Sequence, residues 1–97
     1  NIKRIGNVEF DLLGGVLKTE STRVELRNRE LRLFEVFAAN QDVILSKSKL
    51  VDRIFAGDED VSENAIEVYV GRLRKHWRGS TVEIITVRGL GYRMTSA

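Results

Sequence analysis

Residues 64–75, NAIEVYVGRLRK, contain the pattern that decides the fold. When successive residues are placed about 100° apart, as in an α-helix, the apolar side chains fall on one narrow stripe. The stripe consists of Ile66, Val70, Leu73 and Trp77. Such a stripe predicts an amphipathic helix, which we place at about residues 62–78, with Ser62 as the capping residue. We expect the stripe to face the core.

The opposite face of this predicted helix mixes residue types that a solvent-exposed face rarely combines. Its members are Asn64, Val68, Gly71, Arg72 and Lys75, with Ala65 at the edge, Arg74 and Arg78 on one flank and Tyr69 on the other. Small residues would let the helix lie deep in the DNA major groove, where Val68 could contact a thymine methyl group and Arg72 could bond to guanine. The basic flanks would bind phosphates. The alternative is an ordinary surface helix with one exposed valine.

The residues after this helix predict a β-hairpin. Residues 82–87 are rich in β-branched side chains, residues 89–91 (Gly-Leu-Gly) supply a turn, and residues 92–94 return. We call this hairpin the wing and place it at about residues 84–94. Thr86 and Arg88 point to the same side, with Arg88 at the tip. An arginine there suits the narrow minor groove of DNA, and the alternative is an ordinary exposed charge.

The residues before the helix predict a small sheet and two further helices. Alternating or β-branched segments at 7–12, 16–19 and 23–27 predict antiparallel strands. A helix should follow from Asn28, as its cap, to about residue 40, and another from Ser46 to residues 56–57. The order of strands, three helices and a hairpin predicts an α+β fold of the winged helix-turn-helix type.

The composition excludes several classes of protein. A length of 97 residues supports one small core, so we expect one domain over residues 1–97. The chain has no cysteine and one histidine, His76, which excludes a disulfide framework and a metal site built on several cysteines or histidines. We expect no metal, no cofactor and no catalytic residue, and we interpret His76 as a solvated residue on the helix flank.

Two further expectations concern the cellular context. The chain has no apolar stretch of the length that a membrane span needs, so we expect no membrane association. The absence of cysteine suits a reducing cytoplasm, where we expect the protein to work. Because the first residue is Asn1 rather than methionine, we expect the chain to be part of a longer protein.

Positive charge is concentrated in the last third of the chain. Residues 1–61 carry 10 Lys and Arg against 11 Asp and Glu, whereas residues 71–93 carry 6 basic residues against 1 acidic residue. A basic segment on a nearly neutral body is typical of proteins that bind the phosphate backbone of nucleic acids. The alternative is a solvated basic helix face.

Two segments of the chain carry a resemblance to a known family. Residues 64–75, together with residues 85–93 (ITVRGLGYR), resemble the effector domain of OmpR/PhoB-type response regulators. Residues 26–34 and 50–55 are similar to the first and second helices of that domain, so the resemblance covers nearly the whole chain. It implies a four-stranded antiparallel sheet before a three-helix bundle and a wing. It also implies a bacterial transcription factor of a two-component system, with a receiver domain upstream and a sensor kinase as partner.

The resemblance also implies which residues bind DNA. The expected base contacts are Val68, Arg72, Thr86 and Arg88. The expected backbone contacts are Asn64, Tyr69, Arg74 and Tyr92, to which the helix face adds Lys75. Gly71 and Ala65 depart from the family pattern, which commonly has a basic or polar residue and a hydroxyl there. Trp77 stands in place of the usual leucine.

Two partners follow from the same resemblance. Two copies of the domain are expected to bind tandem half-sites on double-stranded DNA. Some family members contact RNA polymerase through the loop before the third helix, which makes Asp58, Glu59 and Asp60 possible contacts here. These carboxylates would be repelled by DNA phosphates, so we expect them to stand clear of the duplex. The alternative is a solvated acidic turn.

A winged-helix module that binds another protein is the alternative from a different functional class. Its docking surface would be the third helix and the acidic loop. The basic segment 71–93 favours DNA, because a protein-docking surface has no need of that charge. An enzyme has almost no support in this sequence.

Overall fold

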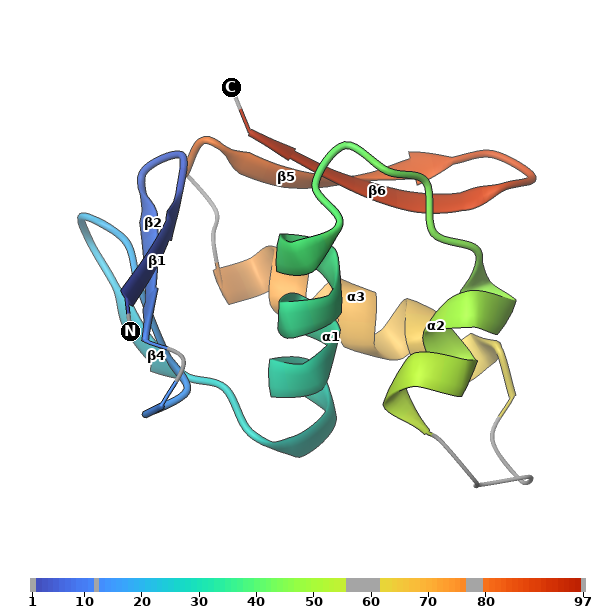
Figure 1. Cartoon of the computed structure of the whole chain (residues 1–97), viewed down its shortest axis with the longest axis horizontal. Coiled ribbons are helices and arrows are strands. Elements are labelled where there is room, and N and C mark those ends of the chain that lie inside the picture. Colours follow the sequence, from blue (N-terminus) through green and yellow to red (C-terminus); the bar gives the residue numbers. More distant parts are fainter. Residues whose placement is uncertain (1, 12, 56–61, 77–79, 97) are drawn as a thin grey trace.

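The computed structural model describes residues 2–11, 13–55, 62–76 and 80–96 (Figure 1). In chain order, these residues form β1 Ile2–Ile5, β2 Val8–Asp11, β3 Val16–Lys18, β4 Arg23–Glu25, α1 Asn28–Ala39, α2 Lys47–Ile54, α3 Asn64–His76, β5 Val82–Val87 and β6 Gly91–Ser96. This order confirms the predicted α+β, winged helix-turn-helix architecture.

The first four strands form an antiparallel sheet in the order β1-β2-β3-β4. Strands β2 to β4 lie where the sequence predicts strands, β2 and β4 from alternation. Strand β1 has no such pattern, since Ile2 is exposed and Ile5 is buried at its two ends, and only the resemblance implied it. The sheet stands at one end of the molecule, and the turn of the β5–β6 hairpin lies at the other (Figure 1).

Helix α2 begins as predicted, because the side chain of Ser46 accepts a hydrogen bond of 3.1 Å from the backbone amide of Lys49. The predicted cap of α1 is wrong by one residue. The chain leaves β4 extended through Arg27, which is the N-cap without a side-chain cap bond, and Asn28 is already helical. Helix α2 ends at Ile54, earlier than predicted.

Helix α3 begins at Asn64 rather than at residue 62. Ser62 lies just before it, and its backbone carbonyl accepts a 3.1 Å hydrogen bond from the amide of Ala65. The predicted residues Trp77 and Arg78 lie outside the described residues. The described part of the apolar stripe is confirmed as core, because Ile66, Val70 and Leu73 are all buried.

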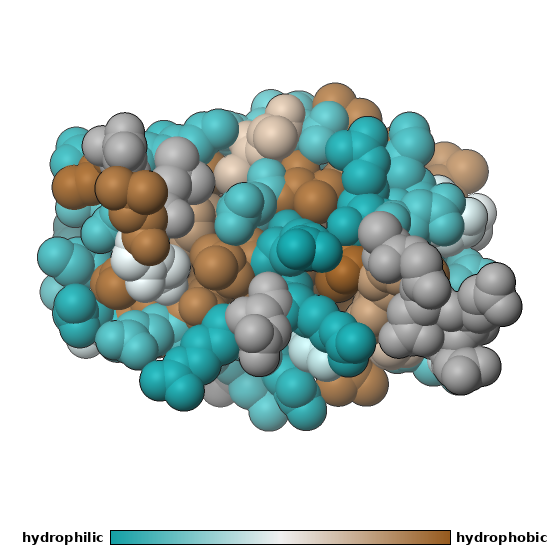
Figure 2. All heavy atoms as spheres, turned by 60° about the horizontal axis from the view of Figure 1, so that its bottom comes forward, coloured by the Kyte–Doolittle hydropathy of each residue, from teal (hydrophilic) through white to brown (hydrophobic). Residues whose placement is uncertain are grey.

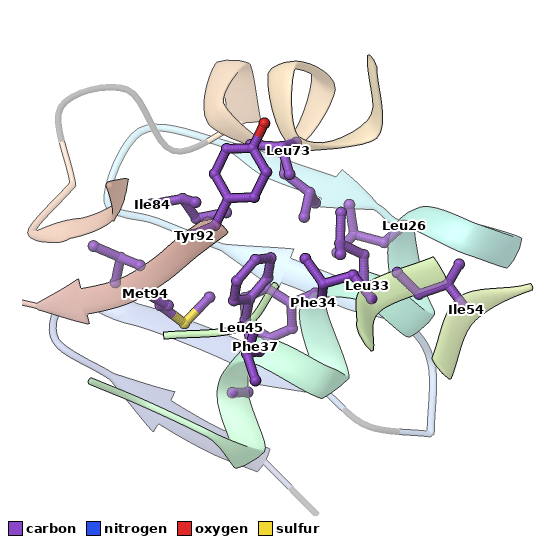
Figure 3. Close-up of a cluster of buried hydrophobic side chains, with 14 of the residues drawn as sticks. Leu26, Leu33, Phe34, Phe37, Leu45, Ile54, Leu73, Ile84, Tyr92 and Met94 are labelled. Carbon is purple, nitrogen blue, oxygen red and sulfur yellow. The ribbon is translucent and has the colours of Figure 1, made fainter. Parts of the chain in front are cut away.

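One hydrophobic core joins the sheet, the helices and the hairpin (Figure 3). The rings of Phe10 in β2 and Phe34 in α1 pack with their centroids 4.4 Å apart, which ties the sheet to the first helix. Leu73 of α3 and Met94 of β6 are fully buried in the same cluster. Each such side chain contributes roughly 1.5–3 kcal/mol when it is removed from water.

The link between α1 and α2 pairs with the hairpin. The backbone amide of Leu45 donates to the carbonyl of Tyr92 at 2.8 Å, and the amide of Tyr92 donates back at 2.9 Å. The amide of Asp42 donates to the carbonyl of Met94, also at 2.8 Å. The base of the wing is therefore fixed to the body of the molecule. Strand β5 covers the predicted residues 82–87, whereas β6 extends to Ser96, beyond the predicted end at residue 94.

Hydrophilic and hydrophobic residues are interleaved on the face of the molecule that Figure 2 brings forward. Among the described residues, no helix is both long and apolar enough to cross a membrane.

Candidate nucleic-acid interface

The outer face of α3 presents the two side chains that the sequence predicts as base contacts. The buried stripe fixes the rotation of the helix, so that Val68 and Arg72, one turn apart, both point away from the core. Val68 is 53% exposed, which is unusual for a valine with a core close by. Asn64 and Lys75 are also exposed, near the two ends of the helix.

Gly71 leaves open space beside these residues. A side-chain carbon added there would meet no atom within 4 Å, other than the backbone of the helix itself and its chain neighbours. Because Gly71 has no side chain, no atoms protrude from the surface of α3 between Val68 and Arg72 at this position. A helix of low profile can approach the floor of a groove closely.

Tyr69 is half-buried and supports Arg72. The guanidinium carbon of Arg72 lies 5.4 Å from the centroid of the Tyr69 ring, in cation–π geometry. The Tyr69 ring also packs against the Phe55 ring, with their centroids 6.0 Å apart, and the guanidinium of Arg29 lies 4.4 Å from the centroid of the Phe55 ring. This row joins α1, the C-cap residue of α2 and α3, and no local sequence pattern indicates it because its members lie far apart in the chain.

Arg74 is directed at the wing. Its Nε and Nη2 atoms donate to the backbone carbonyl of Ile84 at 3.0 and 2.7 Å, and Nη2 also donates to Oγ1 of Thr86 at 2.8 Å. The guanidinium carbon lies 5.7 Å from the centroid of the Tyr92 ring. The sequence placed Arg74 on the flank of the helix but did not reveal these contacts with β5 and β6.

The wing carries Thr86 on β5 and Arg88 directly after this strand. Val82 and Ile84 on one side of β5 are buried, and Thr86 continues this side beyond the core, where it is exposed. Arg88 lies in the turn, next to Gly89, whose positive φ of 78° closes the hairpin. The structure thus places Arg88 at the tip, at a distance from the α3 residues along the hairpin.

Tyr92 is a core residue, with only 5% of its surface exposed. Its ring stands on β6, with the hydroxyl group on the side of α3 (Figure 3). The hydroxyl is therefore the part of this side chain that is suited to a phosphate contact.

Two side-chain contacts of α3 with the other helices were not predicted. Lys47 of α2 donates to the carboxylate of Glu67, and this hydrogen bond raises the pKa of Lys47 above its usual value of 10.5. The pair offsets the negative charge of Glu67 beside Val68. Nε2 of His76 lies 3.4 Å from the Glu30 carboxylate of α1, and both side chains are partly buried, so His76 lies on the helix flank as predicted but is less solvated than predicted.

The described residues contain no group of His, Cys, Asp and Glu that could hold a metal ion. The acidic loop with Asp58, Glu59 and Asp60 lies outside the described residues.

Comparison with known proteins places this arrangement in a class. Residues 21–94 match the family model described as "Transcriptional regulatory protein, C terminal". The chain therefore belongs to this family of DNA-binding transcription regulator domains, which are not enzymes.

The curated relatives narrow the class to OmpR/PhoB-type response regulators. The chain is 37% identical over 94 residues to the transcriptional regulatory protein CiaR of Streptococcus pneumoniae, covering 95% of this chain and 42% of the relative. It is 36% identical over 95 residues to the phosphate regulon transcriptional regulatory protein PhoB of Rhizobium meliloti, covering 96% of this chain and 42% of that protein. The chain thus spans less than half the length of these relatives.

Solved structures agree on the fold. The DNA-binding domain of Escherichia coli CadC superimposes with a TM-score of 0.85 at 22% identity, covering 97% of this chain and 91% of that one. The DNA-binding domain of the response regulator AdeR, solved in complex with an intercistronic region, gives a TM-score of 0.82 at 22% identity, covering 98% and 100%.

Proposed function

We propose that this domain binds a specific double-stranded DNA site with α3 in the major groove and the wing in the minor groove. The observation that carries the proposal is the outer face of α3, where Val68 and Arg72 are exposed opposite a fully buried stripe. Val68 would contact a thymine methyl group, and Arg72 would bond bidentately to guanine. Asn64, Tyr69, Arg74, Lys75 and the hydroxyl of Tyr92 would contact the backbone.

The Arg72→Ala variant tests the major-groove contact. A bidentate arginine–guanine contact contributes about 1–3 kcal/mol of discrimination, so the variant should bind a specific site roughly 5- to 150-fold more weakly while random duplex loses far less. Lys75→Ala is the matched control, because it removes one exposed positive charge from the same helix. The control should weaken both duplexes about equally. Equal losses on the two duplexes for Arg72→Ala would contradict base reading.

The wing is proposed to read the shape of the minor groove through Arg88. An A·T-rich groove is narrow and its negative potential is enhanced, which attracts arginine. Binding sites with A·T flanks should therefore bind the wild type more tightly than sites with G·C flanks. The Arg88→Ala variant should lose this preference, and retention of the preference would exclude the wing from the minor groove.

The partners of the whole protein follow from the family and not from these residues. We infer a receiver domain upstream, phosphorylated by a sensor kinase, because the chain spans only part of its relatives. We also infer that two copies bind tandem half-sites and that the protein works in the cytoplasm, where the bacterial chromosome lies.

RNA polymerase is the partner proposed for the loop with Asp58, Glu59 and Asp60. Neutralising the three residues to Asn and Gln should lower activated transcription at equal promoter occupancy. Unchanged transcription would make the loop a simple acidic turn.

A further inference from the structure

Arg74 bridges the recognition helix and the wing through its planar guanidinium group. Two of its nitrogen atoms donate to the carbonyl of Ile84, and one of them also donates to the hydroxyl oxygen of Thr86. Arginine has five N–H donors. The Nε hydrogen and both Nη2 hydrogens are directed at β5, which leaves only those of Nη1 for any other acceptor.

These contacts lie at the point where the wing leaves the core. Ile84 is buried, whereas Thr86, two residues further along the same side of β5, is exposed. The pairing of Leu45 with Tyr92 fixes β6 to the body of the molecule, and Arg74 provides the corresponding attachment for β5. The stacking of Arg74 over the Tyr92 ring, at 5.7 Å, connects the two attachments.

We propose that Arg74 is a positioning residue that sets the wing relative to α3 and orients the hydroxyl group of Thr86 toward DNA. Because Oγ1 of Thr86 accepts a hydrogen bond from Arg74, its hydroxyl hydrogen is available for a second partner. The acceptors that DNA offers in the minor groove and on phosphates suit that donor. The part of this inference that concerns DNA rests on the proposed function, whereas the attachment of the wing is independent of it.

Lysine cannot replace arginine in this role. The Arg74→Lys variant keeps the positive charge and most of the aliphatic stem, but an ammonium group lacks the planar fork that reaches Ile84 and Thr86 together. A residue that only neutralises a phosphate would tolerate this change. The Arg74→Lys variant therefore separates positioning from charge.

The first experiment uses the full chain without DNA. Amide hydrogen exchange is measured by NMR for wild type, Arg74→Lys and Lys75→Ala, the last of which changes the neighbouring exposed charge on α3. Exchange in the wing, at residues 84–92, should accelerate about threefold or more in Arg74→Lys, with α3 unchanged. Lys75→Ala should leave the wing at the wild-type rate. Wild-type exchange in the wing of Arg74→Lys would overturn the attachment.

The second experiment is a double-mutant cycle on DNA between Arg74→Lys and Arg88→Ala. The two arginines share no contact in the structure that could couple them directly, so coupling has to pass through the position of the wing. The effect of Arg88→Ala on affinity for an A·T-flanked site should shrink about threefold or more in the Arg74→Lys background. An unchanged effect would overturn the role of Arg74 in DNA reading.

The exchange experiment and the double-mutant cycle test different parts of the proposal, so one part can be overturned without the other. If the wild-type chain shows no preference between specific and random duplex, the proposed function is wrong, and the exchange experiment still decides whether Arg74 attaches the wing. A Thr86→Val variant should bind more weakly, and equal binding by Thr86→Val would exclude the hydroxyl as a donor.

Discussion

Glycine occurs at residues 71 and 91 for opposite physical reasons. At Gly71 the helix is regular and the space beside it is open. At Gly91 the backbone has a φ of 138°, and an added side-chain carbon would lie 2.1 Å from the carbonyl oxygen of Leu45. The first glycine costs the helix stability, whereas the second allows β6 to approach the α1–α2 link.

These two sites give a matched pair of predictions on stability. Gly71→Ala should raise the free energy of unfolding by about 0.5–1 kcal/mol, because alanine loses less backbone entropy in a helix. Gly91→Ala should lower it by roughly 2–5 kcal/mol, through the strained φ and the contact with Leu45. Urea unfolding followed by circular dichroism measures both. A Gly91→Ala variant as stable as the wild type would show that the close approach to Leu45 is not required.

At the residue scale, the sequence predicts orientation well and side-chain partners poorly. The exposure of Val68 and Arg72 follows from the helical period once the apolar stripe is known. The fork of Arg74 on β5 depends on the packing of a strand ten residues away, which no local pattern encodes. The contact between His76 and Glu30 spans 46 residues and was missed for the same reason.

At the scale of elements, the pair between Lys47 and Glu67 joins α2 to α3 at the proposed DNA interface. Its raised pKa keeps Lys47 charged throughout the neutral range. Because the pKa of Lys47 is higher in the folded state than in the unfolded state, the charged Lys47 stabilises the folded state fully at pH values below 10.5. This stabilisation is lost as the pH rises through the raised pKa. The contribution of the pair to the free energy of unfolding should therefore be the same at about pH 7 and at about pH 9.

The Glu67→Gln variant tests this pair. Removing the carboxylate should raise affinity for specific and random duplex alike, by about two- to fivefold, since it removes a repulsion from phosphate and frees Lys47. The difference in unfolding free energy from wild type should be equal at about pH 7 and about pH 9, and should shrink above pH 10.5. Glu83→Gln, at an exposed carboxylate on β5, is the control for affinity. An equal gain in affinity from the control would mean that only net charge matters.

The sequence predicted the elements better than their ends. Alternation located β2 and β4 and helical periodicity located all three helices, whereas the hairpin was located by its β-branched residues and glycine turn. Strand β1 was not predicted from the residue pattern, because its four residues, IKRI, do not alternate between apolar and polar. The predicted start of α1 was one residue too late. Asn28 is a residue type that often caps helices, but the chain leaves β4 in an extended conformation through Arg27, which is the actual N-cap.

At the scale of the whole molecule, a single recognition helix limits how much DNA one copy can read. Helix α3 offers two exposed side chains that we propose to read bases, and the proposed contacts of the wing are Thr86 and Arg88. Such a surface covers only a few base pairs, so high specificity requires a second copy. The tandem arrangement proposed for this domain would supply it.

The spacing of half-sites tests the tandem arrangement. Two copies on half-sites about 10–11 bp apart lie on the same side of the duplex and can contact each other. Inserting ~5 bp rotates one copy to the opposite side, so cooperative binding measured by gel shift should vanish. Inserting about 10 bp serves as the control, because it returns the second copy to the same side of the duplex while leaving the two copies farther apart. Cooperativity that survives the half-turn insertion would contradict direct contact between neighbours.

The pairing of Leu45 with Tyr92 has a consequence for biosynthesis. Residues as late in the chain as Met94 belong to the same core as Val8 and Phe10 near its beginning. A nascent chain that still holds residues 92–94 inside the ribosome cannot complete this core, and the long loop between Leu45 and Tyr92 stays open. The native arrangement of α3 and the wing therefore requires that residue 94 has emerged.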